Sequence, residues 1–238
     1  MKICGITRED DALLAVAMGA DAVGFVFAPS KRQIAPSIAR DIVRRLPPEV
    51  LTVGIFRDEA PDRVVEIINA AGLRAAQLHG HESVEATRSI RSRVPLVIKA
   101  FAAVDPALDR AARFGADAVL IDSLHPGSGE GFDWSLAERR AARLRVILAG
   151  GLTPDNVAEA IGQVGPWGVD VATGVEAERG EPGQKDARKV KSFIDAARAA
   201  VPAERVAGEQ FEPYDWMQDD DIVVDDERAH RHVPDDAR

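Results

Sequence analysis

The feature that most constrains the fold is a regular alternation of short apolar segments with segments that have apolar residues at helical spacing. Near-continuous apolar strands are typical of a parallel sheet that is covered on both faces. The first predicted strand lies within residues 1–7, which end in a turn, and the others lie at 22–27, 51–56, 75–78, 96–101, 118–121, 145–149 and 169–172. The predicted helices lie at 8–19, 36–46, 61–70, 82–92, 106–113, 154–162 and 186–200. The pattern therefore predicts an α/β protein.

Eight such units in about 200 residues suit a closed (β/α)₈ TIM barrel over residues 1–202. An open doubly wound sheet is the alternative. Against it, no Gly-x-Gly-x-x-Gly fingerprint follows the first strand, and the glycine-rich turns come late in the chain. We expect the barrel.

Residues 203–238 differ in composition from the rest of the chain. They hold 12 acidic and 4 basic side chains, which is −8 of the total formal charge of −9. Such a segment, with few apolar residues, is typical of disorder, so we predict a disordered acidic tail. The remaining residues are almost neutral, so charge gives no support for binding to nucleic acid.

The cellular setting follows from what the sequence contains. One cysteine cannot form an internal disulfide, which fits a reducing compartment. The N-terminus lacks the apolar run of a signal peptide, and no stretch approaches about 20 uninterrupted apolar residues. We expect a cytoplasmic monomer or homodimer without membrane association.

Two groups capable of proton transfer stand at the ends of predicted strands. Cys4 ends the first strand and Asp122 ends the sixth, and ligands of parallel barrels bind at these ends. Burial would raise the pKa of Asp122 and let it exchange a proton near neutral pH. Each has a simpler interpretation: Cys4 as a small buried hydrophobe, and Asp122 as a cap or loop acceptor.

The loops after the seventh and eighth strands are candidates for binding phosphate. One contains Gly150 and Gly151, and the other contains Thr173 and Gly174. Paired loops of this kind present backbone N–H groups to an anion, although glycines also serve simply to close tight turns. Thr153 is predicted to cap the helix that follows the first of these loops, just as Thr7 is predicted to cap the first helix of the chain.

A basic residue and three histidines complete the candidate groups. Arg32 could form a bidentate pair with a carboxylate, or it could belong to a solvated turn. His79, His81 and His125 match no compact metal-ligand spacing. We expect no metal and no organic cofactor.

Taken together, six stretches resemble the phosphoribosylanthranilate isomerase family from residue 1 to about residue 200. They are Lys2–Thr7, Ser30–Arg32, Gln77–Gly80, Leu120–Ser123 with Gly127–Gly129 and Phe132–Trp134, Ala149–Leu152, and Gly168–Val171 with Gly174–Glu176. The resemblance implies a (β/α)₈ barrel of tryptophan biosynthesis. Its reaction converts N-(5′-phosphoribosyl)anthranilate into 1-(2-carboxyphenylamino)-1-deoxyribulose 5-phosphate without a cofactor.

The resemblance also implies roles for the residues named above. Asp122 would be the general acid and Cys4 the general base, while Arg32 would hold the anthranilate carboxylate. Asp170 would contact the ribose, and the phosphate would be bound by Gly150, Gly151, Thr173 and Gly174. A thiol near its ordinary pKa is mostly protonated at neutral pH, so Cys4 would need a positive potential or a partner.

Two other functions stay open from the sequence. The histidine-pathway isomerase performs the same rearrangement on a different phosphorylated substrate, and that family looks to use two aspartates, so Cys4 is the discriminating residue. A non-catalytic barrel that acts through its acidic tail is the alternative outside enzymes.

Overall fold

The computed structural model describes residues 1–123, 131–141 and 143–201, and these residues contain a closed barrel of parallel strands. The strands follow one another in sequence order, and the eighth pairs with the first. They are β1 (Lys2–Ile3), β2 (Ala22–Val26), β3 (Leu51–Phe56), β4 (Ala75–Leu78), β5 (Leu96–Ala102), β6 (Ala118–Asp122), β7 (Val146–Leu148) and β8 (Gly168–Val171). The predicted barrel is thereby confirmed.

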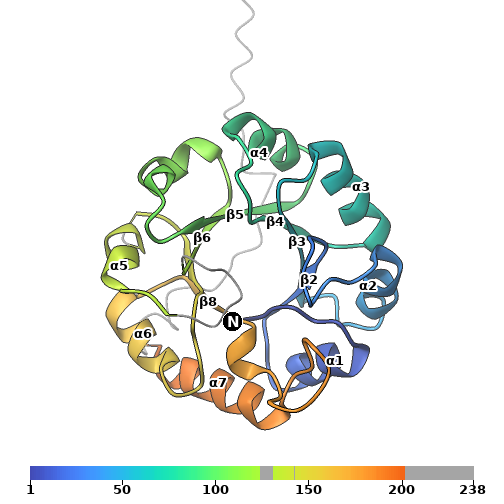
Figure 1. The fold of residues 1–238 in the computed structure, drawn as a ribbon, viewed down its shortest axis with the longest axis vertical. Helices are drawn as coiled ribbons and strands as arrows, with labels where there is room; N and C mark the ends of the chain where they lie inside the picture. Colours follow the sequence, from blue (N-terminus) through green and yellow to red (C-terminus); the bar gives the residue numbers. More distant parts are fainter. Residues whose placement is uncertain (124–130, 142, 202–238) are drawn as a thin grey trace, which may run out of the picture. The chain divides into compact units, whose positions relative to one another are not determined.

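Helices surround the strands on the outside of the ring (Figure 1). They are α1 (Glu9–Ala17), α2 (Pro36–Val43), α3 (Pro61–Ala71), α4 (Val84–Arg91), α5 (Ser135–Ala141), α6 (Val157–Val164) and α7 (Ala187–Ala199), with two 3₁₀ helices, η1 (Pro106–Phe114) and η2 (Thr173–Val175). The order of strands and helices places the loops that leave the C-terminal strand ends at one mouth of the barrel.

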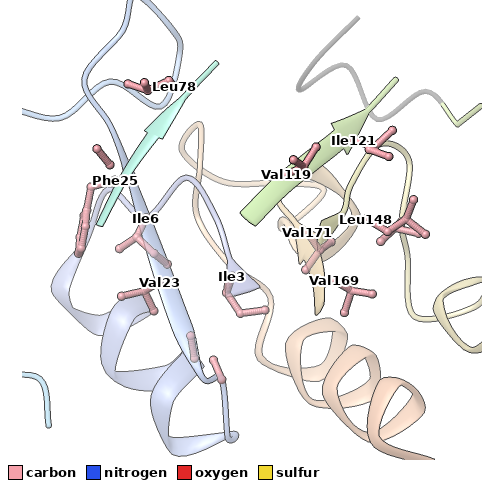
Figure 2. Close-up of a cluster of buried hydrophobic side chains, with 14 of the residues drawn as sticks. Ile3, Ile6, Val23, Phe25, Leu78, Val119, Ile121, Leu148, Val169 and Val171 are labelled. Carbon is pink, nitrogen blue, oxygen red and sulfur yellow. The ribbon is translucent and has the colours of Figure 1, made fainter. Parts of the chain in front are cut away.

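The apolar strands are buried on both faces because alternate side chains point into the barrel and toward the helices. The interior cluster includes Cys4, Val53, Ile98, Leu120 and Ile147. The larger cluster between strands and helices includes Ile3, Phe25, Leu78, Ile121 and Val171, part of which is drawn in Figure 2. These two layers explain why the strands do not alternate between apolar and polar residues.

The structure corrects several local predictions. The segment after β6 contains a helix, α5, that the sequence pattern did not predict, and the segment after β5 is a 3₁₀ helix rather than an α-helix. Thr7 does not cap α1, because Arg8 stands at the N-cap and makes no side-chain cap hydrogen bond. Thr153 does not cap α6 either, because that helix begins at Val157 after Asn156.

Residues 203–238 lie outside the described residues, so their disorder and the domain boundary stay predictions. The same holds for the Gly127–Gly129 stretch and for His125. Within the described part of the chain, no helix is long and apolar enough to cross a membrane.

Candidate active site

Cys4 lies at the C-terminal end of β1 and points into the barrel. Its backbone N–H donates to the carbonyl of Val171 at 2.8 Å, and its side chain belongs to the interior cluster. Gly24 on the neighbouring β2 makes room for it, since a Cβ at position 24 would lie 2.9 Å from the Cys4 sulfur. The thiol is therefore closely packed and buried.

An ion pair lies beside this thiol. Lys2 and Asp170 are register partners on β1 and β8, and the Lys2 Nζ is 2.7 Å from the Asp170 Oδ1. Burial and the charge of Asp170 raise the pKa of Cys4, while the charges of Lys2 and Lys185 lower it; the net direction is upward. The structure thus identifies the positive partners that the sequence could not.

Asp122 ends β6 and is buried at the barrel mouth. Its Oδ1 accepts a hydrogen bond from the N–H of Ser123 at 2.7 Å, and its Oδ2 is 3.4 Å from the His79 Nε2. The Gln77 amide nitrogen lies 3.1 Å from the His79 Nδ1. If that amide donates, the neutral His79 carries its proton on Nε2, which faces the carboxylate.

From the sequence, His79 was considered only as a metal ligand and was given no catalytic role, although it directly follows a strand just as Cys4 and Asp122 stand at strand ends. Its loop is fixed by a buried ion pair between Lys99 and Glu82, whose Nζ–Oε2 distance is 2.9 Å. Lys99 also donates to the Gly80 carbonyl, and Glu82 accepts from the Gly80 N–H. These bonds hold the loop that carries His79.

The two glycine loops and Asp122 line a single pocket of about 260 Å³. Its walls are residues 149–153 and 170–174 together with Asp122, so Gly150, Gly151, Asp170, Thr173 and Gly174 all contribute to it. The loops touch: a Cβ at Gly174 would lie 2.0 Å from the Leu152 carbonyl oxygen. Gly150 and Gly151 both have positive φ, 83° and 66°, which favours glycine at each position.

Arg32 is buried in the loop after β2, but its guanidinium fork is already paired within the protein. Its Nε is 2.5 Å from Glu176 Oε1, and its Nη2 donates to Glu176 Oε2 at 3.1 Å and to Thr173 Oγ1 at 2.9 Å. A Cβ at Gly5 would lie 2.4 Å from the Arg32 Cδ. Arg32 therefore joins the loops that follow β1, β2 and β8.

Lys185, like Lys2, is a buried charged residue to which the sequence analysis gave no role. Its fully buried Nζ is 3.4 Å from Glu176 Oε1 and donates to the carbonyl of Ala172 at 3.3 Å. Burial raises the pKa of Glu176, but hydrogen bonding to Arg32 and the charges of Lys185 and Arg32 outweigh it and lower the pKa overall. Glu176 is thus held as a carboxylate between two cations.

The arrangement brings the two glycine loops and the buried Asp122 together in one pocket, and it places the Cys4 thiol at a strand end of the same barrel. A phosphate at the glycine loops would place the attached carbon skeleton beside Asp122, because the same pocket contains both. The described residues contain no group of three or more His, Cys, Asp or Glu side chains suited to a metal ion. The geometry suits proton transfer on a phosphorylated small molecule.

Comparison with known proteins gives a consistent result. Residues 1–196 match the family model of N-(5′-phosphoribosyl)anthranilate (PRA) isomerase. The N-(5′-phosphoribosyl)anthranilate isomerase of Desulforudis audaxviator is 50% identical over 208 residues, which are 84% of this chain and 98% of that protein.

Solved structures agree with this result. The phosphoribosyl anthranilate isomerase of Thermus thermophilus superposes with a TM-score of 0.78 at 44% identity, covering 84% of this chain and 98% of the other. Another phosphoribosyl anthranilate isomerase structure holds reduced 1-(o-carboxyphenylamino)-1-deoxyribulose 5-phosphate. It superposes with a TM-score of 0.74 at 45% identity, covering 83% and 97% of the two chains.

Proposed function

The chain belongs to the N-(5′-phosphoribosyl)anthranilate isomerase family, and on this premise we propose that Asp122 is the general acid and Cys4 the general base of its reaction. The enzyme is an aldose–ketose isomerase of tryptophan biosynthesis. It converts N-(5′-phosphoribosyl)anthranilate into 1-(2-carboxyphenylamino)-1-deoxyribulose 5-phosphate by an Amadori rearrangement.

The rearrangement needs two proton transfers, one at the ring oxygen and one at C2′, which are both bonded to C1′. In the first, Asp122 gives a proton to the furanose ring oxygen while the bond from that oxygen to C1′ breaks and the amine nitrogen forms a Schiff base. In the second, the Cys4 thiolate removes the proton from C2′, which yields an enolamine that becomes the ketose. Both groups lie at C-terminal strand ends, where a barrel binds its substrate.

One observation carries the assignment of Asp122: it lines the same pocket as the two glycine loops. The assignment of Cys4 rests on its place at the C-terminal end of β1 and on the family resemblance. A sugar whose 5-phosphate rests against residues 150–151 and 173–174 lies within reach of the Asp122 carboxylate. The Ser123 N–H binds Oδ1 of Asp122, which leaves Oδ2 for the substrate and for His79. Asp170, in the same lining, is the proposed ribose contact.

We assign the anthranilate carboxylate to Arg32, as the resemblance of the loop implies. Because Glu176 occupies the fork of Arg32, the substrate carboxylate has to replace Glu176 or use the remaining N–H groups of the guanidinium. The ligand is a phosphorylated small molecule. A cytoplasmic location and a monomeric or homodimeric state stay expectations from the sequence.

The test is the loss of substrate fluorescence when the protein is added to freshly generated N-(5′-phosphoribosyl)anthranilate. We expect rapid turnover by the wild type, no measurable turnover by Asp122→Asn and strongly reduced turnover by Cys4→Ser. Asp41→Asn is the control, because Asp41 is exposed and its ion pair among the described residues is with exposed Arg40. Undiminished turnover by Asp122→Asn would remove the acid from the mechanism, and an inactive but folded wild type would refute the function.

A further inference from the structure

We propose that Lys2 is the positioning residue of the Cys4 base: its buried ammonium, fixed by Asp170, stabilises the thiolate that receives the C2′ proton. The inference deepens the proposed function and rests on the role given there to Cys4. Lys2 does not itself line the pocket; it pairs with Asp170, which does, and it lies beside the Cys4 thiol, so it would act on the substrate through its neighbours rather than by direct contact.

The backbone of β1 brings the two side chains together. Lys2 and Cys4 are two residues apart on an extended segment, so both point to the same face, which is the barrel interior. Gly24 on β2 opposes both of them. A Cβ at that position would lie 2.9 Å from the Cys4 sulfur and 3.3 Å from the Lys2 Cε. The end of the lysine chain and the thiol therefore share the space left by one missing side chain.

Asp170 keeps Lys2 charged in this place. The two side chains are only 5% and 9% exposed, and their ion-pair distance is 2.7 Å. Burial lowers the pKa of Lys2, but the charges of Asp170 and of a Cys4 thiolate outweigh burial and raise it. The pair stands among apolar interior residues such as Val53, Leu120 and Ile147, and Gln77 and Asp122 are further polar residues buried in the barrel. Because replacing a buried ion pair with apolar residues is often neutral for stability, the place of this pair beside the thiol points to a function.

Three charged side chains of the described residues shift the pKa of Cys4, each in a known direction. Asp170 from β8 raises the pKa of Cys4, whereas Lys2 from β1 and Lys185 from the loop before α7 lower it. Removing Lys2 therefore moves the thiol pKa up, and removing Asp170 moves it down. A purely structural role for the pair predicts no such opposite shifts.

The test uses the fact that Cys4 is the only cysteine of the chain. Alkylation by iodoacetamide, in which the thiolate carbon–sulfur bond forms and iodide leaves, therefore reports on Cys4 thiolate alone. We expect Lys2→Met to move the midpoint of the alkylation pH profile upward by about one pH unit, with a rate at pH 8 about tenfold lower. Asp170→Asn should move it downward. Lys191→Met, which removes an exposed lysine paired with Asp195, is the control and should move nothing.

A second pair of variants keeps the proposal falsifiable if Lys2→Met folds poorly, because that change leaves Asp170 without its counter-ion. The double variant Lys2→Met with Asp170→Asn has no unpaired charge, and Asp170→Asn alone is its reference. The midpoint should again be higher in the variant that lacks Lys2. Equal midpoints in both comparisons would overturn the proposal.

Turnover separates this inference from the proposed function. We expect Lys2→Met to lower kcat at neutral pH and to move the kcat profile toward higher pH, with a small change in KM. If Cys4→Ser retained full turnover, Cys4 would not be the base and the proposal would fall with that role, even where alkylation still showed the interaction with Lys2. If Cys4→Ser is inactive and Lys2→Met keeps the wild-type profile, the base stands and Lys2 has no part in it.

Discussion

At the scale of single residues, Arg32 joins separate parts of the site, because it contacts loops that follow three different strands. We predict that Arg32→Lys raises KM by about tenfold or more and changes kcat less. A lysine keeps the charge but cannot reproduce the planar fork that holds Glu176 and would hold a substrate carboxylate. Steady-state kinetics by the fluorescence assay measure both constants.

Arg40→Lys is the matched control, since Arg40 pairs with Asp41 on the exposed face of α2. It should leave both kinetic constants unchanged. A loss confined to kcat in Arg32→Lys would contradict the prediction and would mean that Arg32 arranges Glu176 and Thr173 without binding substrate.

Some residues of the candidate site could be identified from the sequence, and others could not. Cys4 and Asp122 were identifiable because a polar group at the end of an apolar strand stands out, and His79 carried the same signal. Lys2 and Lys185 carried none. A lysine is normally an exposed residue, and only the closed barrel shows that Lys2 is paired with a residue 168 positions away on β8.

At the scale of elements, the proposed phosphate cradle depends on how closely two loops approach. We predict that Gly174→Ala raises KM strongly, because its new Cβ would lie 2.0 Å from the backbone oxygen of Leu152 and would force the loops apart. Backbone cannot move aside as the end of a flexible side chain can. Binding of inorganic phosphate, measured by calorimetry, should weaken in parallel.

Gly162→Ala is the control for this change. Gly162 lies in α6, and a Cβ there would meet nothing within 4 Å. It should leave KM unchanged and stabilise the fold by up to about 1 kcal/mol, through the better helix propensity of alanine. Unchanged phosphate binding in Gly174→Ala would show that the cradle lies elsewhere.

Element boundaries were less predictable than the elements themselves. Apolar runs revealed all eight strands, but α5 was missed, and both predicted threonine caps were wrong. At α6 the reason is visible: the Thr153 N–H donates to Asn156 Oδ1 and the Asn156 amide donates to the Gly151 carbonyl. These side-chain bonds build a turn over residues 151–156, so the helix begins after Asn156 and not after Thr153.

At the scale of the whole molecule, the grouping of the candidate site residues could be predicted because the fold assembles it. Cys4, Asp122, Asp170 and the two glycine loops come from positions spread over the chain, yet a parallel barrel brings all C-terminal strand ends to one mouth. Knowing the order of strands and helices was therefore enough to group these residues. The pairing of Arg32 with Glu176 was not accessible in this way, because it depends on side-chain directions within loops.

The extent of the catalytic unit leads to the last prediction, that residues 1–202 alone retain full turnover and an unchanged melting temperature. All eight strands and the helix α7 precede residue 202, and the family model ends at residue 196. The relative from Desulforudis audaxviator is covered over 98% of its length by 84% of this chain. Calorimetry and the fluorescence assay on the full chain and on residues 1–202 would check both quantities. Removing residues 203–238 takes away −8 of the −9 formal charges, which reduces charge repulsion and so cannot by itself lower the melting temperature. A lower melting temperature or lost turnover would therefore mean that the acidic segment stabilises the barrel.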